Sequence, residues 1–284
     1  MPGRKPVAAP PPRDDPASSD GATPAPDTPA PAATGKGPAY HAAAIAVAME
    51  RLRWLERNPA PTRIDVNIAS ARLTYWRDGA VADSRVVVVG ANETRTPQLG
   101  SPMFRLVANP TWTIPPSIVK KDNMAQRSGR SLARSGMKWV GRRIVQEPGP
   151  RNSLGIVKFD LRNGHAIYLH DTPAKGLFAA SRRWRSHGCV RVKDASGFAT
   201  LIATDSGQAE RWGELTAGEA TASLPLPREI PVRLLYATVL LDEAQAPVFG
   251  ADPYDWDAPV ARRLGFAVPL PVTKPKEGAA DSGP

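Results

Sequence analysis

The first hydrophobic pattern along the chain has the period of an α-helix. Ile45, Met49, Leu52 and Leu55 recur every three or four residues within HAAAIAVAMERLRWLERNPAP at 41–61. This spacing predicts an amphipathic helix with these four side chains on its buried stripe. The prolines at 59 and 61 are expected to close it.

From Arg63 onward the period changes to the two-residue alternation of β-strands. Ile64, Val66 and Ile68 alternate with polar residues, and the turn RDGA at 77–80 leads to the run SRVVVVG at 84–90. Further strands are predicted at 104–110, 155–161, 165–171 and 231–241, and a short helix at 198–203 follows the start signal KDAS at 193–196. Long strands with few helices favour a mainly β fold, a sandwich, over a doubly wound sheet.

The composition of the two ends differs from that of the centre. Residues 1–38 are mostly Pro, Ala, Gly, Ser, Thr and Asp, and residues 273–284 have the same character. Such segments bury too little apolar surface to offset the entropy of ordering, so we expect a disordered linker and a disordered tail. The predicted helix then occupies 39–62, and one domain occupies 63–262.

The net charge of +10 is concentrated in one part of the chain. Between residues 117 and 151, nine Lys and Arg residues stand against Asp122 and Glu147, and the polar segment 117–150 is predicted to be an insertion over one face of the domain. A basic patch suits a polyanion, including an anionic cell-wall polymer, or is simply a solvated surface. We expect no nucleic-acid partner, because no zinc-finger spacing or RNA-binding aromatic signature accompanies the charge.

Cysteine content and hydropathy constrain the compartment only weakly. A single cysteine excludes an intrachain disulfide. No apolar run approaches the roughly 18 residues of a membrane span, and residues 1–38 contain no signal-peptide h-region. The sequence therefore predicts no transmembrane segment and shows no export signal of its own.

The candidate chemistry lies in the stretch RSHGCVRV at 185–192, which contains the one cysteine. A nucleophilic cysteine needs a neighbouring base, because an ordinary thiol with a pKa of about 8.5 is little ionised at neutral pH. His170, at the end of the predicted strand AIYLH, and His187 are the two candidate bases for Cys189. Ser186 is suited either to bond a histidine or to cap the turn, Gly188 permits a close backbone approach to an oxyanion, and Arg191 is suited to grip a carboxylate.

Plainer interpretations compete with each of these. A lone cysteine is often a small core residue, but a core filler does not require a flanking Ser-His-Gly and a second histidine. A zinc site is disfavoured because no carboxylate completes the ligand set, so neither a metal nor an organic cofactor is expected. Trp112 fits a peptide groove or a packing corner equally well, whereas Tyr168 is more typical of the core than of a pocket.

A histidine, then fifteen intervening residues at 171–185, then SHGCVR: this pattern resembles the active-site signature of the L,D-transpeptidases, the YkuD-like catalytic family. The similarity extends over about residues 45–262, through NPTWTIPPSI at 109–118 and NSLGIVKFDLRNGHAIYLHDTPAKGLF at 152–178. In detail the chain resembles the larger Gram-negative members, in which a mobile cap precedes the NSLG strand. Here that cap is residues 117–150.

The resemblance implies a YkuD-like β-sandwich and a set of site residues. Cys189 corresponds to the nucleophile, His170 to its base and His187 to the second histidine of the motif. Ser186, Gly188 and Arg191 match the remaining motif positions. The family further implies stem peptides of peptidoglycan as donor and acceptor, 3-3 cross-links as product, carbapenems as inhibitors, and the periplasm or cell envelope as location.

Two rivals remain open at this stage. The first is an L,D-carboxypeptidase or cross-link hydrolase on the same scaffold, in which water replaces the acceptor amine. The second is a non-enzymatic basic protein that binds cell wall or nucleic acid, which predicts that Cys189 is inert to alkylation.

Overall fold

The computed structural model describes residues 37–266, and the predicted linker and tail lie almost entirely outside this range. The fold is mainly β, as predicted, with a nine-stranded mixed sheet at its centre. Its strands are β1 (Arg63–Asn67), β2 (Arg72–Arg77), β3 (Ala80–Gly90), β4 (Leu99–Ala108), β8 (Val157–Leu161), β9 (Leu169–His170), β10 (Trp184–Ser186), β11 (Val190–Val192) and β12 (Ala222–Leu235).

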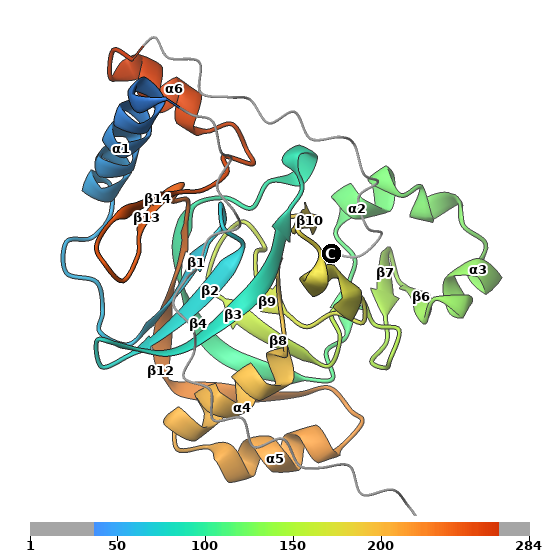
Figure 1. The fold of residues 1–284 in the computed structure, drawn as a ribbon. Coiled ribbons are helices and arrows are strands. Elements are labelled where there is room, and N and C mark those ends of the chain that lie inside the picture. The colour runs from blue at the N-terminus through green and yellow to red at the C-terminus, as the bar shows by residue number, and fades with distance from the viewer. Residues whose placement is uncertain (1–36, 267–284) are drawn as a thin grey trace, which may run out of the picture.

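The large sheet closes on itself. Its strand order is β10-β3-β11-β9-β8-β4-β12-β1-β2. A further pairing of β2 with β3 closes the sheet, so the two layers visible in Figure 1 belong to one hydrogen-bonded sheet. The long strand β12 pairs with β4 on one side and with β1 on the other, and its register shifts between Pro225 and Ile230. Alternate residues of these strands, such as Val66, Leu106 and Phe159, fill the core between the layers.

Helices α4 (Ala195–Asp205) and α5 (Ala209–Ala217) cover one end of this core. The side chain of Asp194 caps α4 by accepting a hydrogen bond from the Gly197 N–H at 3.1 Å. Phe198 and Ile202 of α4 and Trp212 of α5 are buried in the core. The predicted helix at 198–203 is thus confirmed, although it begins earlier, and α5 was not predicted.

The N-terminal helix forms as predicted but buries the opposite face. Helix α1 (Pro38–Arg53) packs against α6 (Asp257–Arg263) and the hairpin of β13 (Val239–Leu241) and β14 (Pro247–Phe249). Its buried residues are Tyr40, Ala43, Ala44, Val47 and Arg51, whereas the predicted stripe of Ile45, Met49 and Leu52 is 36–65% exposed.

A buried ion pair explains which face of α1 turns inward. Arg51 bonds the Asp257 carboxylate at 2.8 Å and donates to the Tyr236 carbonyl at 3.0 Å. Small side chains on the same face let the helix approach α6 closely. The helix also ends at Arg53, before either proline that was expected to close it.

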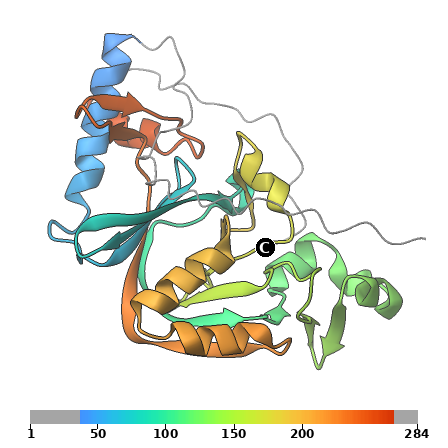
Figure 2. The ribbon, with the colours of Figure 1, turned by 60° about the horizontal axis from the view of Figure 1, so that its bottom comes forward.

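In the structure the cap reaches beyond 117–150, from Trp112 to Leu154, and has a small core of its own, which the sequence pattern did not reveal. Strands β5 (Trp112–Thr113), β7 (Arg143–Gln146) and β6 (Met137–Val140) form a three-stranded sheet, joined by α2 (Pro116–Lys121), α3 (Gly129–Arg134) and the 3-10 turn Met124–Gln126. Figure 2 shows this unit beside the strands β8 and β9. Its core consists of Trp112, Ile114, Ile118, Met124, Leu132, Met137, Ile144 and Leu154.

Buried amide side chains join the cap to the main domain. Asn152 donates to the carbonyls of Pro110 at 2.8 Å and Glu147 at 2.9 Å, and it accepts from the Leu154 N–H at 2.8 Å. Gln146 donates to the carbonyls of Ser135 and Arg151. These hydrogen bonds connect both ends of the cap to the main domain. They come from single amide side chains, so no long apolar repeat in the sequence pointed to a folded unit here.

None of the helices among residues 37–266 combines the length and the apolar character that crossing a membrane requires.

Candidate active site

Cys189 lies in a tight turn between β10 and β11. The Ser186 hydroxyl donates to the Cys189 carbonyl at 2.6 Å and accepts from the Gly188 N–H at 3.1 Å. Gly188 has φ +119°, a conformation that residues with a Cβ rarely adopt. Of the two roles considered for Ser186, the structure therefore shows turn capping.

Two threonines in the segment that follows β3 form hydrogen bonds with the carbonyls of this turn. The Thr94 hydroxyl donates to the Ser186 carbonyl at 2.9 Å, and the Thr96 hydroxyl donates to the Gly188 carbonyl at 2.7 Å. The Thr96 N–H in turn donates to the Tyr254 hydroxyl at 3.2 Å. The Thr-Pro at 96–97 lies within the region 45–262 that resembles the family, but no other sequence signal pointed to Thr94 or Thr96, because threonines in polar loops are common.

Strand pairing brings both His170 and Cys189 to one face of the sheet. Strands β9 and β11 are parallel, with Val190 opposite Leu169 and Arg191 opposite His170. Because Leu169 and Val190 point into the core, the alternate residues His170 and Cys189 belong to the other face. This is the face on which the cap packs.

His170 is fully buried and has one ring nitrogen free to act as a base. Its Nδ1 forms a short hydrogen bond with the Asp171 carbonyl, and since a carbonyl only accepts, Nδ1 carries the proton. Its Nε2 has no hydrogen-bond partner among the described residues. Burial first, and then the charge of Arg191, lower the pKa of His170 to about 3.

Asp171 is the residue that orients His170. Its carboxylate accepts from the Ile156 N–H at 3.2 Å and pairs with Lys175. Gly155 leaves the space for this carboxylate, because a Cβ there would lie 2.3 Å from Asp171 Oδ2. The sequence reasoning did not identify Asp171.

The thiol of Cys189 is neutral in the resting structure. The residue is 8% exposed, and Sγ lies 3.8 Å from the Ala166 carbonyl. Burial raises the pKa of Cys189 to about 11, against the lowering effects of hydrogen bonding from Tyr168 and of the charges of Lys158 and Arg191. Desolvation therefore outweighs the neighbouring charges, and the thiol needs a base, as the sequence argument expected.

Tyr168 links Cys189 to the cap. Its ring lies edge-on to His170 with centroids 5.6 Å apart, and Lys158 Nζ lies 4.4 Å from the ring centroid. Burial first, and then its interaction with Cys189, raise the pKa of Tyr168. Tyr168 packs against the cap core, in which Trp112 is 2% exposed, so Trp112 is a packing residue and does not form an open groove wall.

The remaining motif residues are less exposed to solvent than a direct substrate-binding role requires. Arg191 is 1% exposed, so its guanidinium does not face solvent as a carboxylate clamp would, and its charge acts on His170 and Cys189. His187 is half-buried within the turn. The Gly188 N–H is already bonded to Ser186, which leaves the Cys189 N–H as the better oxyanion donor of the two.

Within the described part of the chain, no group of three or more His, Cys, Asp or Glu residues is placed to hold a metal ion. The site therefore offers a thiol, a neutral imidazole, and the fixed charges of Lys158 and Arg191.

The buried neutral His170 predicts a specific loss of stability in acid. In the unfolded chain a histidine binds a proton near pH 6.5, whereas in the folded state it does so only near pH 3. The free energy of unfolding should therefore decrease as pH falls through this window, by about 2 kcal/mol between about pH 7 and pH 5. Urea unfolding of the wild type and of His170→Gln at both pH values measures this, and an equal decrease in both proteins would contradict it.

Comparisons with known proteins identify the family of this chain. Residues 61–208 match the family model of the YkuD L,D-transpeptidase catalytic domain. A Haemophilus influenzae protein named "Putative L,D-transpeptidase" is 32% identical over 203 residues, covering 63% of this chain and 41% of that protein. The chain thus spans about two-fifths of the length of this curated relative.

Solved structures of L,D-transpeptidases are more distant. The catalytic domain of the Enterococcus faecium enzyme acylated by ertapenem is 15% identical, with a TM-score of 0.35 over 63% of this chain and 99% of that one. L,D-transpeptidase 3 of Mycobacterium tuberculosis with a faropenem-derived adduct is 11% identical, with a TM-score of 0.34 over 62% and 60%. The assignment rests on the match to the family model, which covers more than half of the chain: the chain belongs to the YkuD family of L,D-transpeptidase catalytic domains.

Proposed function

We propose that this protein is a cysteine-dependent L,D-transpeptidase that forms 3-3 cross-links between peptidoglycan stem peptides in the periplasm or cell envelope. The observation that carries the proposal is the pairing of β9 with β11, which brings His170, with Nε2 unbonded, and Cys189 to the same face of the sheet.

In the first half of the reaction, His170 Nε2 takes the Cys189 proton as the sulfur attacks. The target is the carbonyl of the third residue of a donor tetrapeptide, at its L centre. The sulfur–carbon bond forms as the bond to D-alanine breaks, and the imidazolium gives its proton to the departing amine. The Cys189 N–H supports the oxyanion of the tetrahedral intermediate.

In the second half, the side-chain amine of a diaminopimelate on an acceptor stem attacks the thioester. His170 receives the amine proton, the amide bond forms, and the sulfur leaves and regains a proton from the imidazolium. Each half-reaction returns the histidine to its neutral state, which is the state that its pKa of about 3 favours at neutral pH.

Product analysis tests this function directly. Incubation of the protein with purified disaccharide tetrapeptides should yield a dimer with the mass of donor plus acceptor less one alanine. Cys189→Ala should yield no dimer, because no thioester forms. Mass spectrometry distinguishes the outcomes, and a tripeptide in place of the dimer, with the mass of the donor plus one water less one alanine, would assign the chain to the hydrolases.

A further inference from the structure

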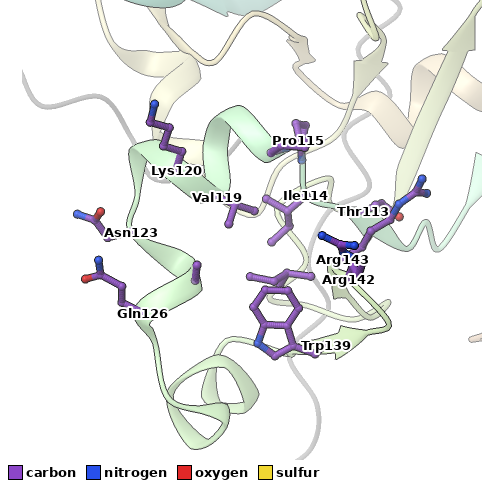
Figure 3. Close-up of a pocket in the computed structure, with 13 residues that line it drawn as sticks. Thr113, Ile114, Pro115, Val119, Lys120, Asn123, Gln126, Trp139, Arg142 and Arg143 are labelled. Atoms are coloured by element: carbon purple, nitrogen blue, oxygen red, sulfur yellow. The ribbon is translucent and has the colours of Figure 1, made fainter.

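The cap contains a cavity that the proposed chemistry at Cys189 does not use. Its volume is about 520 Å³, within the range of small-ligand sites. Figure 3 shows that it lies between the 114–126 segment and the hairpin of β6 and β7.

One side of this cavity is apolar. Trp139 of β6 stands opposite Ile144 of β7 in the register, and both line the cavity together with Ile114, Pro115 and Val119. The Trp139 side chain is 46% exposed. An indole is a large apolar group, so its burial is favourable in free energy. An exposed indole at the mouth of a formed cavity is suited to contact the aliphatic part of a ligand.

The polar side of the cavity is cationic. Lys120, Arg142 and Arg143 line it, and no aspartate or glutamate does. Among the described residues none of these three cations forms an ion pair, whereas Lys138 outside the cavity bonds Glu147 at 2.8 Å. Three unneutralised cations around one cavity favour a ligand with more than one carboxylate.

The cavity is connected to the reactive face through the cap core. Ile114 and Ile144 line the cavity and also belong to the cluster of side chains that contains Trp112. Tyr168, beside Cys189, packs against the same cluster. A ligand held in the cavity is therefore bound by the structural unit that packs on Tyr168, which interacts with Cys189.

We propose that this cavity binds the acidic stem peptide of the acceptor strand, with its carboxylates on Lys120, Arg142 and Arg143 and its aliphatic side chain against Trp139. The proposal rests on the proposed transpeptidase function and identifies where the second substrate is held. A stem peptide carries several carboxylates, whereas the N-acetylated sugars of the glycan are uncharged and would not require three cations.

The test uses the full-length protein after acylation by a carbapenem, so that the donor site is occupied. A fluorescently labelled L-Ala–γ-D-Glu–diaminopimelate–D-Ala peptide is titrated and its anisotropy followed. We expect Arg142→Gln/Arg143→Gln to raise the Kd about tenfold, since each lost contact is to a charged group. Trp139→Ala should raise it several-fold.

The matched control is Lys121→Gln/Arg130→Gln, which removes the same charge from cap positions that do not line the cavity. It should leave the Kd within about twofold, and raised salt should weaken binding to the wild type more than to the arginine variant. Unchanged acylation rates in all variants would show that their folds are intact.

Equal Kd values for the two double variants, or no binding of the peptide to the acylated wild type, would overturn the proposal. So would binding of a neutral N-acetylglucosamine oligomer, with loss in Trp139→Ala, in place of the peptide. A wild type that the carbapenem does not acylate would instead count against the proposed function, and the same peptide titration on the unmodified protein would then decide for or against the cavity.

Discussion

A Cys189→Ser protein will acquire no carbapenem mass under conditions in which the wild type gains one drug molecule per chain. A serine hydroxyl is far less ionised than a thiol, and a buried site that raises the pKa of a thiol to about 11 disfavours an alkoxide even more. Intact-protein mass spectrometry over time gives the result, with Cys189→Ala as a second variant.

The fold should survive this substitution. The hydrogen bonds of the turn use the Cys189 carbonyl and the Ser186 hydroxyl, not the sulfur. A circular dichroism melt matching that of the wild type would confirm it. Full acylation of Cys189→Ser, or of Cys189→Ala, would remove Cys189 from the mechanism.

His170→Ala should slow acylation by at least about 100-fold, the typical cost of losing a general base. The imidazole is held by the Asp171 carbonyl through Nδ1, which leaves Nε2 as the basic nitrogen. His187→Ala should have a smaller effect, mainly through the geometry of the turn. The rate constants come from the same mass-spectrometric time course.

Iodoacetamide alkylation as a function of pH separates the two histidines further. In the wild type the rate should increase with pH up to about 11, because the thiol is protonated below its raised pKa. If His187→Ala, and not His170→Ala, shifts this profile to higher pH, then His187 is the base. The assignment of the enzyme class would remain unchanged by that result.

Sequence reasoning was most successful where local patterns decide structure. The alternation of Ile64 and Val66 and the run at 84–90 predicted β1 and β3. The predicted strand at 165–171 shrank to Leu169–His170, because Ala166 adopts φ +54° in the preceding turn.

The failures concern contacts between distant parts of the chain. The buried face of α1 depends on Asp257, more than 200 residues away, and no periodicity within 41–61 reports that partner. Likewise the pKa of the Cys189 thiol depends on its burial in the folded chain, which the neighbouring sequence does not reveal. The sequence predicted that a histidine base assists the thiol, and tertiary packing raises the pKa that this base has to overcome.

The position of β12 has a consequence for how this protein is made. The strand that completes β1 through the pairs Ile64–Val232 and Val66–Leu234 emerges from the ribosome about 170 residues after β1 itself. Tyr254, which accepts a hydrogen bond from Thr96 in the loop beside Cys189, emerges later still. Until nearly the whole described chain has been synthesised, β1 lacks its neighbour β12. The loop that hydrogen-bonds the Cys189 turn also lacks its contact with Tyr254. Non-local pairing of this kind slows folding. We therefore expect the nascent protein to carry an unformed catalytic site through most of its translation, so that reactivity appears only once the C-terminal strands have joined the sheet.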